Sequence, residues 1–107
     1  MTRQKESPKM IEPQLEFPLK ATKVSHLDNQ DYVEGLQFEN DTIDFPLANL
    51  EINGCTFSHV TFASSMERVD LLDVVFDHCD LSNLDFSNRS IHRVFFRDCK
   101  LVGTIFI

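Results

Sequence analysis

Large apolar side chains recur at every fifth position of this sequence, and this period constrains the fold more than any other feature. A helix would repeat its apolar face about every 3.6 residues and a half-buried strand every second residue, so neither element explains the pattern. A second set of mostly small or apolar residues lies two positions before each member. With a one-residue slip after Phe62, the series consists of Leu47, Ile52, Phe57, Phe62, Met66, Leu71, Phe76, Leu81, Phe86, Ile91, Phe96, Leu101 and Phe106.

Two inward positions in every five, separated by one outward position, suit a short extended segment that ends in a turn. Asn, Asp, Ser and Gly at the remaining positions supply the turn chemistry. Four such segments close a square coil of about 20 residues, and successive coils stack as parallel strands about 4.8 Å apart. We therefore expect an all-β fold, a quadrilateral β-helix of about three to four coils over residues 36–107.

Stacking places the inward residues of successive coils on top of one another. One expected column holds Phe57, Phe76 and Phe96, with an interval of 19 residues at the slip, and a second holds Val60, Cys79 and Cys99. A third contains Leu47, Met66, Phe86 and Phe106. The predicted structural core is Phe57, Phe76, Phe96, Cys79, Cys99, Leu81, Phe86 and Leu101.

Residues 1–35 do not follow the repeat. Three prolines and few apolar residues in the first 23 positions predict an extended arm. Residues 24–35 are expected to form a short cap with a helical turn around 28–33. Leu36, Phe38 and Ile43 then begin an irregular first coil in this prediction. The expected organisation is therefore an arm and cap over 1–35 and a β-helix over 36–107.

The segment from Cys79 to Phe86, CDLSNLDF, resembles the A-[D/N]-L-x-x pattern of the pentapeptide-repeat family, and the resemblance covers residues 36–107. The run from Cys79 to Gly103 is similar to the Qnr-like chromosomal members of Gram-positive bacteria, in which segments similar to CDLSNLDFS, IHRV and CKLVG occur in this order. This resemblance implies a right-handed β-helix. Because those proteins are about twice as long and finish in a dimerising segment, it also implies that this chain corresponds to an N-terminal half.

Charge is distributed in blocks along the chain, which carries a net charge of −7. Residues 24–88 contain thirteen Asp and Glu residues against Arg68 alone. Such a block repels nucleic acid and attracts basic surfaces. We expect a partner-binding acidic surface, with a solvated acidic face as the plainer alternative, formed by Asp70, Asp73, Asp77, Asp80 and Asp85.

The resemblance also implies a function, a non-enzymatic DNA mimic that occupies the basic DNA saddle of DNA gyrase or topoisomerase IV and relieves quinolone poisoning. A generic protein–protein scaffold and a remnant of a longer repeat protein are the alternatives. The expected partner is a protein, without direct nucleic-acid binding. No apolar run approaches the roughly 20 residues of a membrane span, so no membrane contact is expected.

The residues that could carry chemistry do not form a recognisable catalytic or metal motif. Cys79 and Cys99 should be neighbours that could form a disulfide, but small buried residues in a reducing cytoplasm are favoured. His59 and His78 occupy equivalent outward positions followed by Asp98, and a solvated histidine ladder is favoured over a metal pair because no further ligand has suitable spacing. We expect no catalytic site, metal or cofactor.

The last coil departs from the pattern. Arg89 occupies an inward position, where an unpaired charge is costly, and Phe95 and Ile105 are apolar where the family is usually polar. An irregular coil or a contact face would explain these departures. Phe106 and Ile107 finish a coil that lacks a polar cap, so we expect a homodimer through this end, with fraying of a monomer as the alternative.

Overall fold

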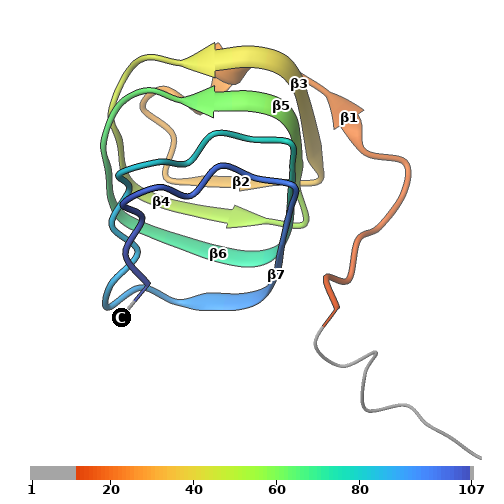
Figure 1. Cartoon of the computed structure of the whole chain (residues 1–107). Coiled ribbons are helices and arrows are strands. Elements are labelled where there is room, and N and C mark those ends of the chain that lie inside the picture. The colour runs from red at the N-terminus through yellow and green to blue at the C-terminus, as the bar shows by residue number, and fades with distance from the viewer. Residues whose placement is uncertain (1–11, 107) are drawn as a thin grey trace, which may run out of the picture.

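The structure is a computed structural model that describes residues 12–106, and nearly all of its regular structure is parallel strand (Figure 1). The expectations for residues 1–11 of the arm and for Ile107 lie outside the described residues. One 3-10 helix is present in the described chain, η2 (Val24–Leu27). The strands are β1 (Lys20–Ala21), β2 (Tyr32–Glu34), β3 (Leu36–Ile43), β4 (Leu47–Asn53), β5 (Thr56–Phe62), β6 (Met66–Asp77) and β7 (Ile91–Arg97).

The strands wind into a β-helix of about four turns, as the period of five predicts. On one side β3, β5 and the end of β6 are stacked, and on another side β2, β4 and the beginning of β6 are stacked. β6 is 12 residues long because it continues around the corner at Asp73 and pairs with β7 on both sides of it. Figure 1 shows the coils lying parallel to one another, with the chain passing from one to the next.

The register contains the predicted slip. Phe57 pairs with Phe38 and with Phe76 at an interval of 19 residues, and Phe76 pairs with Phe96 at an interval of 20. The slip lies on the same side of two successive coils, because the steps from Ile43 to Leu47 and from Phe62 to Met66 are each one residue shorter than usual. No residue between 60 and 66 has a positive φ, so this side is closed without the left-handed turn found at other corners.

The core is a stack of inward rings and aliphatic side chains. Phe38, Phe57, Phe76 and Phe96 form a continuous column with ring centroids 4.9, 5.1 and 5.1 Å apart. Phe86 stacks in the same manner on Phe106, at 5.3 Å. Phe57, Phe76, Cys79, Leu81 and Phe86 are buried. Because inward positions repeat along the axis, the rings of Phe57 and Phe76 each contact a ring of the coil above and a ring of the coil below.

Left-handed backbone conformation marks the corners. Non-glycine residues with positive φ are Asn29, Asn40, Asn49, His59, Arg68, Asp73, His78, Asn83, Asn88, Arg93 and Asp98. Asn, Asp and His tolerate this region better than other side chains, which explains why the non-periodic positions of the sequence are rich in them. Most of these residues directly precede an inward residue, as His78 precedes Cys79. The corner conformation therefore turns the next side chain into the core.

The N-terminal part differs from the expectation in two respects. The helical turn lies at η2, before the predicted range 28–33, and Tyr32–Glu34 is instead a strand that pairs with β4. The first coil is also more regular than expected, because β3 pairs with β5 from Gln37 to Ile43. β1 covers the edge of β3, while Val24 and Leu27 are buried over the core. This segment caps the N-terminal end of the described solenoid.

The last coil is less buried than the coils before it. Phe96, Cys99 and Leu101, which were predicted to be core residues, are only partly buried, because no coil of the described chain covers their open side. Val102 is 67% exposed and Phe106 is 46% exposed, although Phe106 lies at an inward position of the repeat. None of the helices within residues 12–106 has the length and hydropathy needed to span a bilayer.

Candidate protein-interaction surface

The five predicted acidic residues surround one coil instead of forming a row along the axis. Asp70 lies on the β4–β6 side, Asp77 ends β6, and Asp80 and Asp85 form isolated bridges on the following two sides. A surface that imitates a phosphate row needs successive charges along the axis, since the backbone charges of DNA follow one another along the helix. The five aspartates therefore do not form one continuous surface.

Asp73 is not part of the exposed surface that was predicted for it. The residue is only 6% exposed, and its carboxylate accepts hydrogen bonds from Arg93, including one of 2.8 Å from Nη2 to Oδ2. The backbone N–H of Gln14 donates to Oδ1 at 2.9 Å. The Arg93 hydrogen bond holds the pKa of Asp73 below its usual value, against the opposing effect of burial. Asp73 therefore joins the arm to two coils.

Asp80 and Asp85 stabilise turns. Asp80 Oδ1 accepts a hydrogen bond from the Ser82 N–H at 3.0 Å, and Asp85 Oδ1 accepts one from the Ser87 N–H at 2.8 Å. These are local Asx-type contacts, which hold the backbone in a turn. The serine hydrogen bonds lower the pKa of both carboxyl groups. The two aspartates are thus charged groups with a structural role within each repeat.

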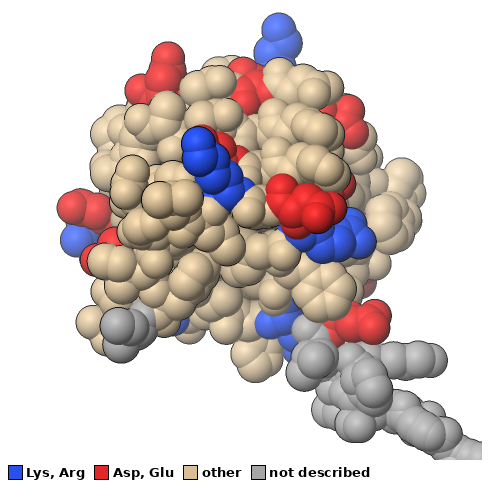
Figure 2. Space-filling model, in the orientation of Figure 1, with Lys and Arg blue, Asp and Glu red and all other residues tan. Residues whose placement is uncertain are grey.

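The basic residues of the last coil lie beside acids of the coil above. Arg93 contacts Asp73, Arg97 pairs in register with Asp77, and Lys100 pairs with Asp80. Figure 2 shows several places on the visible side where Lys or Arg lies next to Asp or Glu. Uncharged atoms separate these places from one another. Opposite charges at one strand spacing offset each other's field. The acidic coil is consequently less negative in space than the sequence block suggests.

The β2–β4 side of the solenoid, in contrast, carries acids in successive coils. We define the acidic face as Asp31, Glu34, Glu51 and Asp70, all of which are exposed. Tyr32 pairs with Glu51, and Glu51 pairs with Asp70, so these side chains follow one another along the axis. No Lys or Arg occurs at positions 31–34, 50–53 or 69–72. Sequence reasoning included only Asp70 here, although the 19-residue interval between Glu51 and Asp70 was a signal for Glu51.

Tyr32 adds an exposed aromatic ring to the acidic face. Its hydroxyl donates to Glu34 Oε1 at 2.8 Å and accepts a hydrogen bond of 3.4 Å from the Asn53 amide. The hydrogen bond to Glu34 raises the pKa of Tyr32. An aromatic ring among carboxylates offers two kinds of contact to a basic partner. Lys and Arg side chains interact favourably with the face of the ring and also donate charge-assisted hydrogen bonds to the carboxylates.

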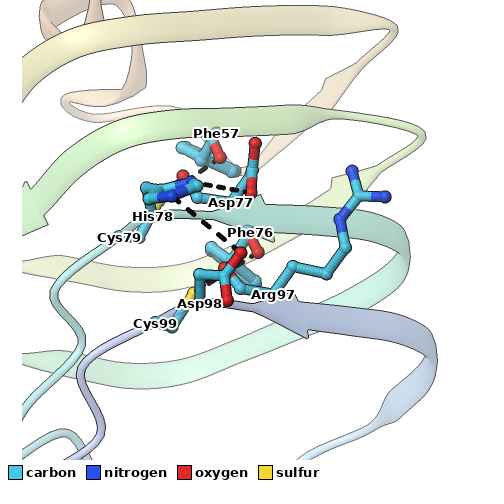
Figure 3. A network of polar contacts seen from close by, with 8 residues as sticks. All are labelled: Phe57, Phe76, Asp77, His78, Cys79, Arg97, Asp98 and Cys99. Carbon is cyan, nitrogen blue, oxygen red and sulfur yellow. Dashed lines mark hydrogen bonds and ion pairs between the residues drawn. The ribbon is translucent and has the colours of Figure 1, made fainter.

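The cysteines do not form a reactive group. Cys55, Cys79 and Cys99 are free thiols. Cys79 Sγ donates to the Phe57 carbonyl oxygen and Cys99 Sγ to the Phe76 carbonyl oxygen, each at 3.3 Å (Figure 3). Burial raises the pKa of Cys79 to about 11. A thiol in this environment stays protonated at neutral pH, whereas thiolate is the nucleophile and the metal ligand.

Arg89 occupies the inward position that the sequence indicates, and it is half-buried there. One guanidinium nitrogen, Nη1, donates to the Asn88 carbonyl oxygen at 3.3 Å. Its Nε atom is buried and has no hydrogen-bond partner among residues 12–106. The residue lies in the same column as Leu50 and Val69, so it interrupts the apolar core at the last coil.

Comparison with known proteins supports the repeat assignment. Residues 70–106 match the family model described as pentapeptide repeats, with eight copies. A search of curated proteins and a search of solved structures found no match. Proteins with this β-solenoid are generally structural or binding proteins and not enzymes. Residues 70–106 are therefore similar in sequence to pentapeptide repeats, the β-solenoid fold is consistent with this similarity, and the similarity favours a protein-interaction scaffold.

Proposed function

We propose that this chain is a non-enzymatic, cytoplasmic binding protein whose acidic face docks on a basic surface of another protein. The observation that supports the proposal is that Asp31, Glu34, Glu51 and Asp70 lie on one side of three successive coils, where positions 31–34, 50–53 and 69–72 contain no Lys or Arg. Complementary charge steers association and selects the partner more than it adds affinity. The other sides of the solenoid, where basic residues of the last coil lie beside acids of the coil above, then serve as a rigid support for this face.

Within this class, we propose DNA gyrase or topoisomerase IV as the partner to test first. Their DNA saddle is basic because it binds phosphate, and Glu51 and Asp70 of the acidic face lie one strand spacing apart along a rigid rod. In this proposal the chain is a DNA mimic, and the carboxylates on its β2–β4 side take the place of DNA phosphates. Other basic protein surfaces satisfy the same electrostatic requirement, and the scaffold function does not depend on the gyrase assignment.

Neutralising the acidic face should slow association with gyrase about tenfold at low salt. The variant combines Glu34→Gln, Glu51→Gln and Asp70→Asn, and the rate is measured by surface-immobilised binding. A charge-matched control carries Glu39→Gln, Asp44→Asn and Glu67→Gln, which are exposed on other parts of the coils. Wild-type association should also slow between about 50 and 200 mM salt, because screening shortens the reach of the field.

Three outcomes separate the alternatives in this experiment. Equal slowing in both triple variants would show that net charge matters and that the acidic face does not. Salt-independent binding would contradict electrostatic docking altogether. An absence of gyrase binding at low salt, together with unchanged supercoiling activity with and without quinolone, would exclude the gyrase assignment and leave a scaffold for another protein.

We also propose that the open last coil associates with a second copy. Val102, Ile105 and Phe106 are exposed apolar residues at this end of the described solenoid. A solenoid end that exposes apolar side chains and unpaired backbone groups tends to associate. The same coil carries the exposed side chains of Arg97 and Lys100, whose charges Asp77 and Asp80 offset only in part, so like charges oppose the pairing. Screening should weaken that repulsion, which gives dimerisation the opposite salt dependence from partner binding.

Sedimentation equilibrium at micromolar concentration should detect a dimer of the 12.4 kDa chain, and more of it at higher salt. Replacing Ile105 and Phe106 together with serine should give a monomer, since the apolar contact is lost. The control is Phe17→Ser, which removes an exposed apolar residue from the arm. A wild-type monomer at every concentration would contradict the dimer and favour fraying of the last coil.

A further inference from the structure

The corner column that contains His59, His78 and Asp98 brings metal-ligating groups of three successive coils together. All three residues have left-handed backbone, with φ of 55, 55 and 52°. The rings of His59 and His78 are stacked with centroids 4.8 Å apart and an interplanar angle of 16°. Because the corner conformation repeats, these side chains project in the same direction. The solenoid therefore arranges two imidazoles and a carboxylate along one edge.

Asp77 orients the middle imidazole. Its Oδ1 atom lies 3.0 Å from Nδ1 of His78. A carboxylate can only accept a hydrogen bond, so it favours the neutral tautomer with the proton on Nδ1. The lone pair is then on Nε2, which faces Asp98. A carboxylate that binds the second nitrogen of a ligating histidine is a recurrent arrangement at zinc sites.

The gap between Nε2 of His78 and Oδ2 of Asp98 is 3.9 Å, too long for a hydrogen bond. Zinc binds nitrogen and carboxylate oxygen at about 2.0–2.2 Å, so an ion between these two atoms fits with little movement. Ligand atoms of Asp77, His78 and Asp98 all lie within 4.8 Å of one another. Figure 3 shows this group on the outside of the coil, with the Arg97 side chain directed away from His78.

A surface hollow beside the group is lined by His59, Asp80 and Lys100 as well as by His78 and Asp98. The hollow gives an ion access to water, which would complete its coordination. Lys100 opposes a cation here, but its charge is partly offset by Asp80, with which it pairs in register. An imidazole nitrogen with carboxylate support favours a transition ion over the oxygen-seeking Mg²⁺ and Ca²⁺.

We propose that His78 and Asp98 bind a divalent transition ion such as Zn²⁺, with Asp77 as the residue that positions His78. The spacing in the sequence favours a solvated histidine ladder, because no third or fourth ligand is suitably placed. The structure adds Asp77, which directly precedes His78 in the sequence and contacts Nδ1, the ring nitrogen that does not face Asp98. The proposal is independent of the acidic face, which lies on another side of the solenoid.

Calorimetric titration of the untagged full chain with Zn²⁺ should show saturable binding at one site. His78→Asn should weaken it at least about tenfold while the fold is kept, because asparagine already occupies equivalent corners at Asn83 and Asn88. Asp98→Asn should have a similar effect, and Asp77→Asn should weaken binding about tenfold by releasing the orientation of the ring.

His92→Asn is the matched control, since His92 is exposed and lies outside this corner column. Circular dichroism and thermal unfolding of each variant show whether the solenoid remains intact. The proposal is overturned if Zn²⁺ does not bind saturably, if folded His78→Asn and Asp98→Asn bind as wild type does, or if His92→Asn loses binding to the same extent. Ring signals of His78 in NMR spectra should shift on Zn²⁺ addition, and unchanged signals would also contradict it.

Discussion

Replacing Phe76 with alanine should lower the free energy of unfolding by about 3–5 kcal/mol. Phe76 is 0% exposed. Its ring lies between those of Phe57 and Phe96, at 5.1 Å from each, and it meets the edge of Phe62 at 5.6 Å. The substitution removes the apolar transfer energy of the ring and leaves a cavity in the middle of a stack. Stability is to be measured by reversible urea unfolding at neutral pH.

The matched control is Phe106→Ala, at the open end of another ring column. Phe106 stacks on Phe86 on one side and is 46% exposed, so its removal opens no enclosed cavity and should cost much less. A domain of this size has a total stability of roughly 5–15 kcal/mol, so Phe76→Ala could unfold it. If it does unfold, Phe76→Leu is measured instead. This substitution keeps most of the side-chain volume and should cause a smaller decrease in the free energy of unfolding. A loss below about 1 kcal/mol in Phe76→Ala would contradict a central position for this ring.

The fold could be derived from the sequence because one physical rule repeats along the chain. The inward residues of each five-residue unit recur in phase, so Phe57, Phe76 and Phe96 fix both the coil length and the slip. The cap was harder to derive. Val24 and Leu27 lie outside the period, and the strand Tyr32–Glu34 shows its register only through pairing with β4.

Charge was less predictable than the core, because sequence order does not show which charges become neighbours. The five predicted aspartates are consecutive in the acidic block, but a square coil distributes them around its circumference. Arg93 and Lys100 lie after this block in the sequence. One turn of the coil brings each beside an acid, Asp73 or Asp80. A period of about 20 residues therefore has to be applied to charged residues as well as to apolar ones.

The junction of Asp73, Arg93 and Gln14 shows what such a pairing contributes. Among the Lys and Arg residues that the structure describes, Arg68 and Arg93 have a positive φ, a conformation that is unfavourable for long side chains. Arg68 Nε donates to Asn49 at 2.6 Å, and Arg93 is held by the Asp73 carboxylate. Each guanidinium thus reaches back to the corner of the preceding coil. These contacts oppose the local backbone preference and connect one coil to the next.

Replacing Asp73 with asparagine should lower the free energy of unfolding by about 2 kcal/mol at pH 7. Asparagine tolerates the left-handed corner, so the backbone is unchanged and the charge is lost. The estimate is below the roughly 3–5 kcal/mol for breaking a fully buried ion pair, because the Arg93 side chain is 29% exposed and partly screened by solvent. Urea unfolding of wild type and variant at pH 7 measures the difference. Asp44→Asn, at an exposed acid, is the control.

The same substitution should remove one part of the pH dependence of stability. The pKa of Asp73 in the folded chain is held below its ordinary value of 3.8, primarily by the Arg93 hydrogen bond. Its contribution is therefore complete above about pH 4 and is lost as the pH falls through the folded-state pKa, where the native carboxylate takes up a proton. The stability difference between wild type and Asp73→Asn should shrink over this acid range. A variant that matches wild type at pH 7, or a difference that grows on acidification, would show that the carboxylate of Asp73 does not stabilise the junction.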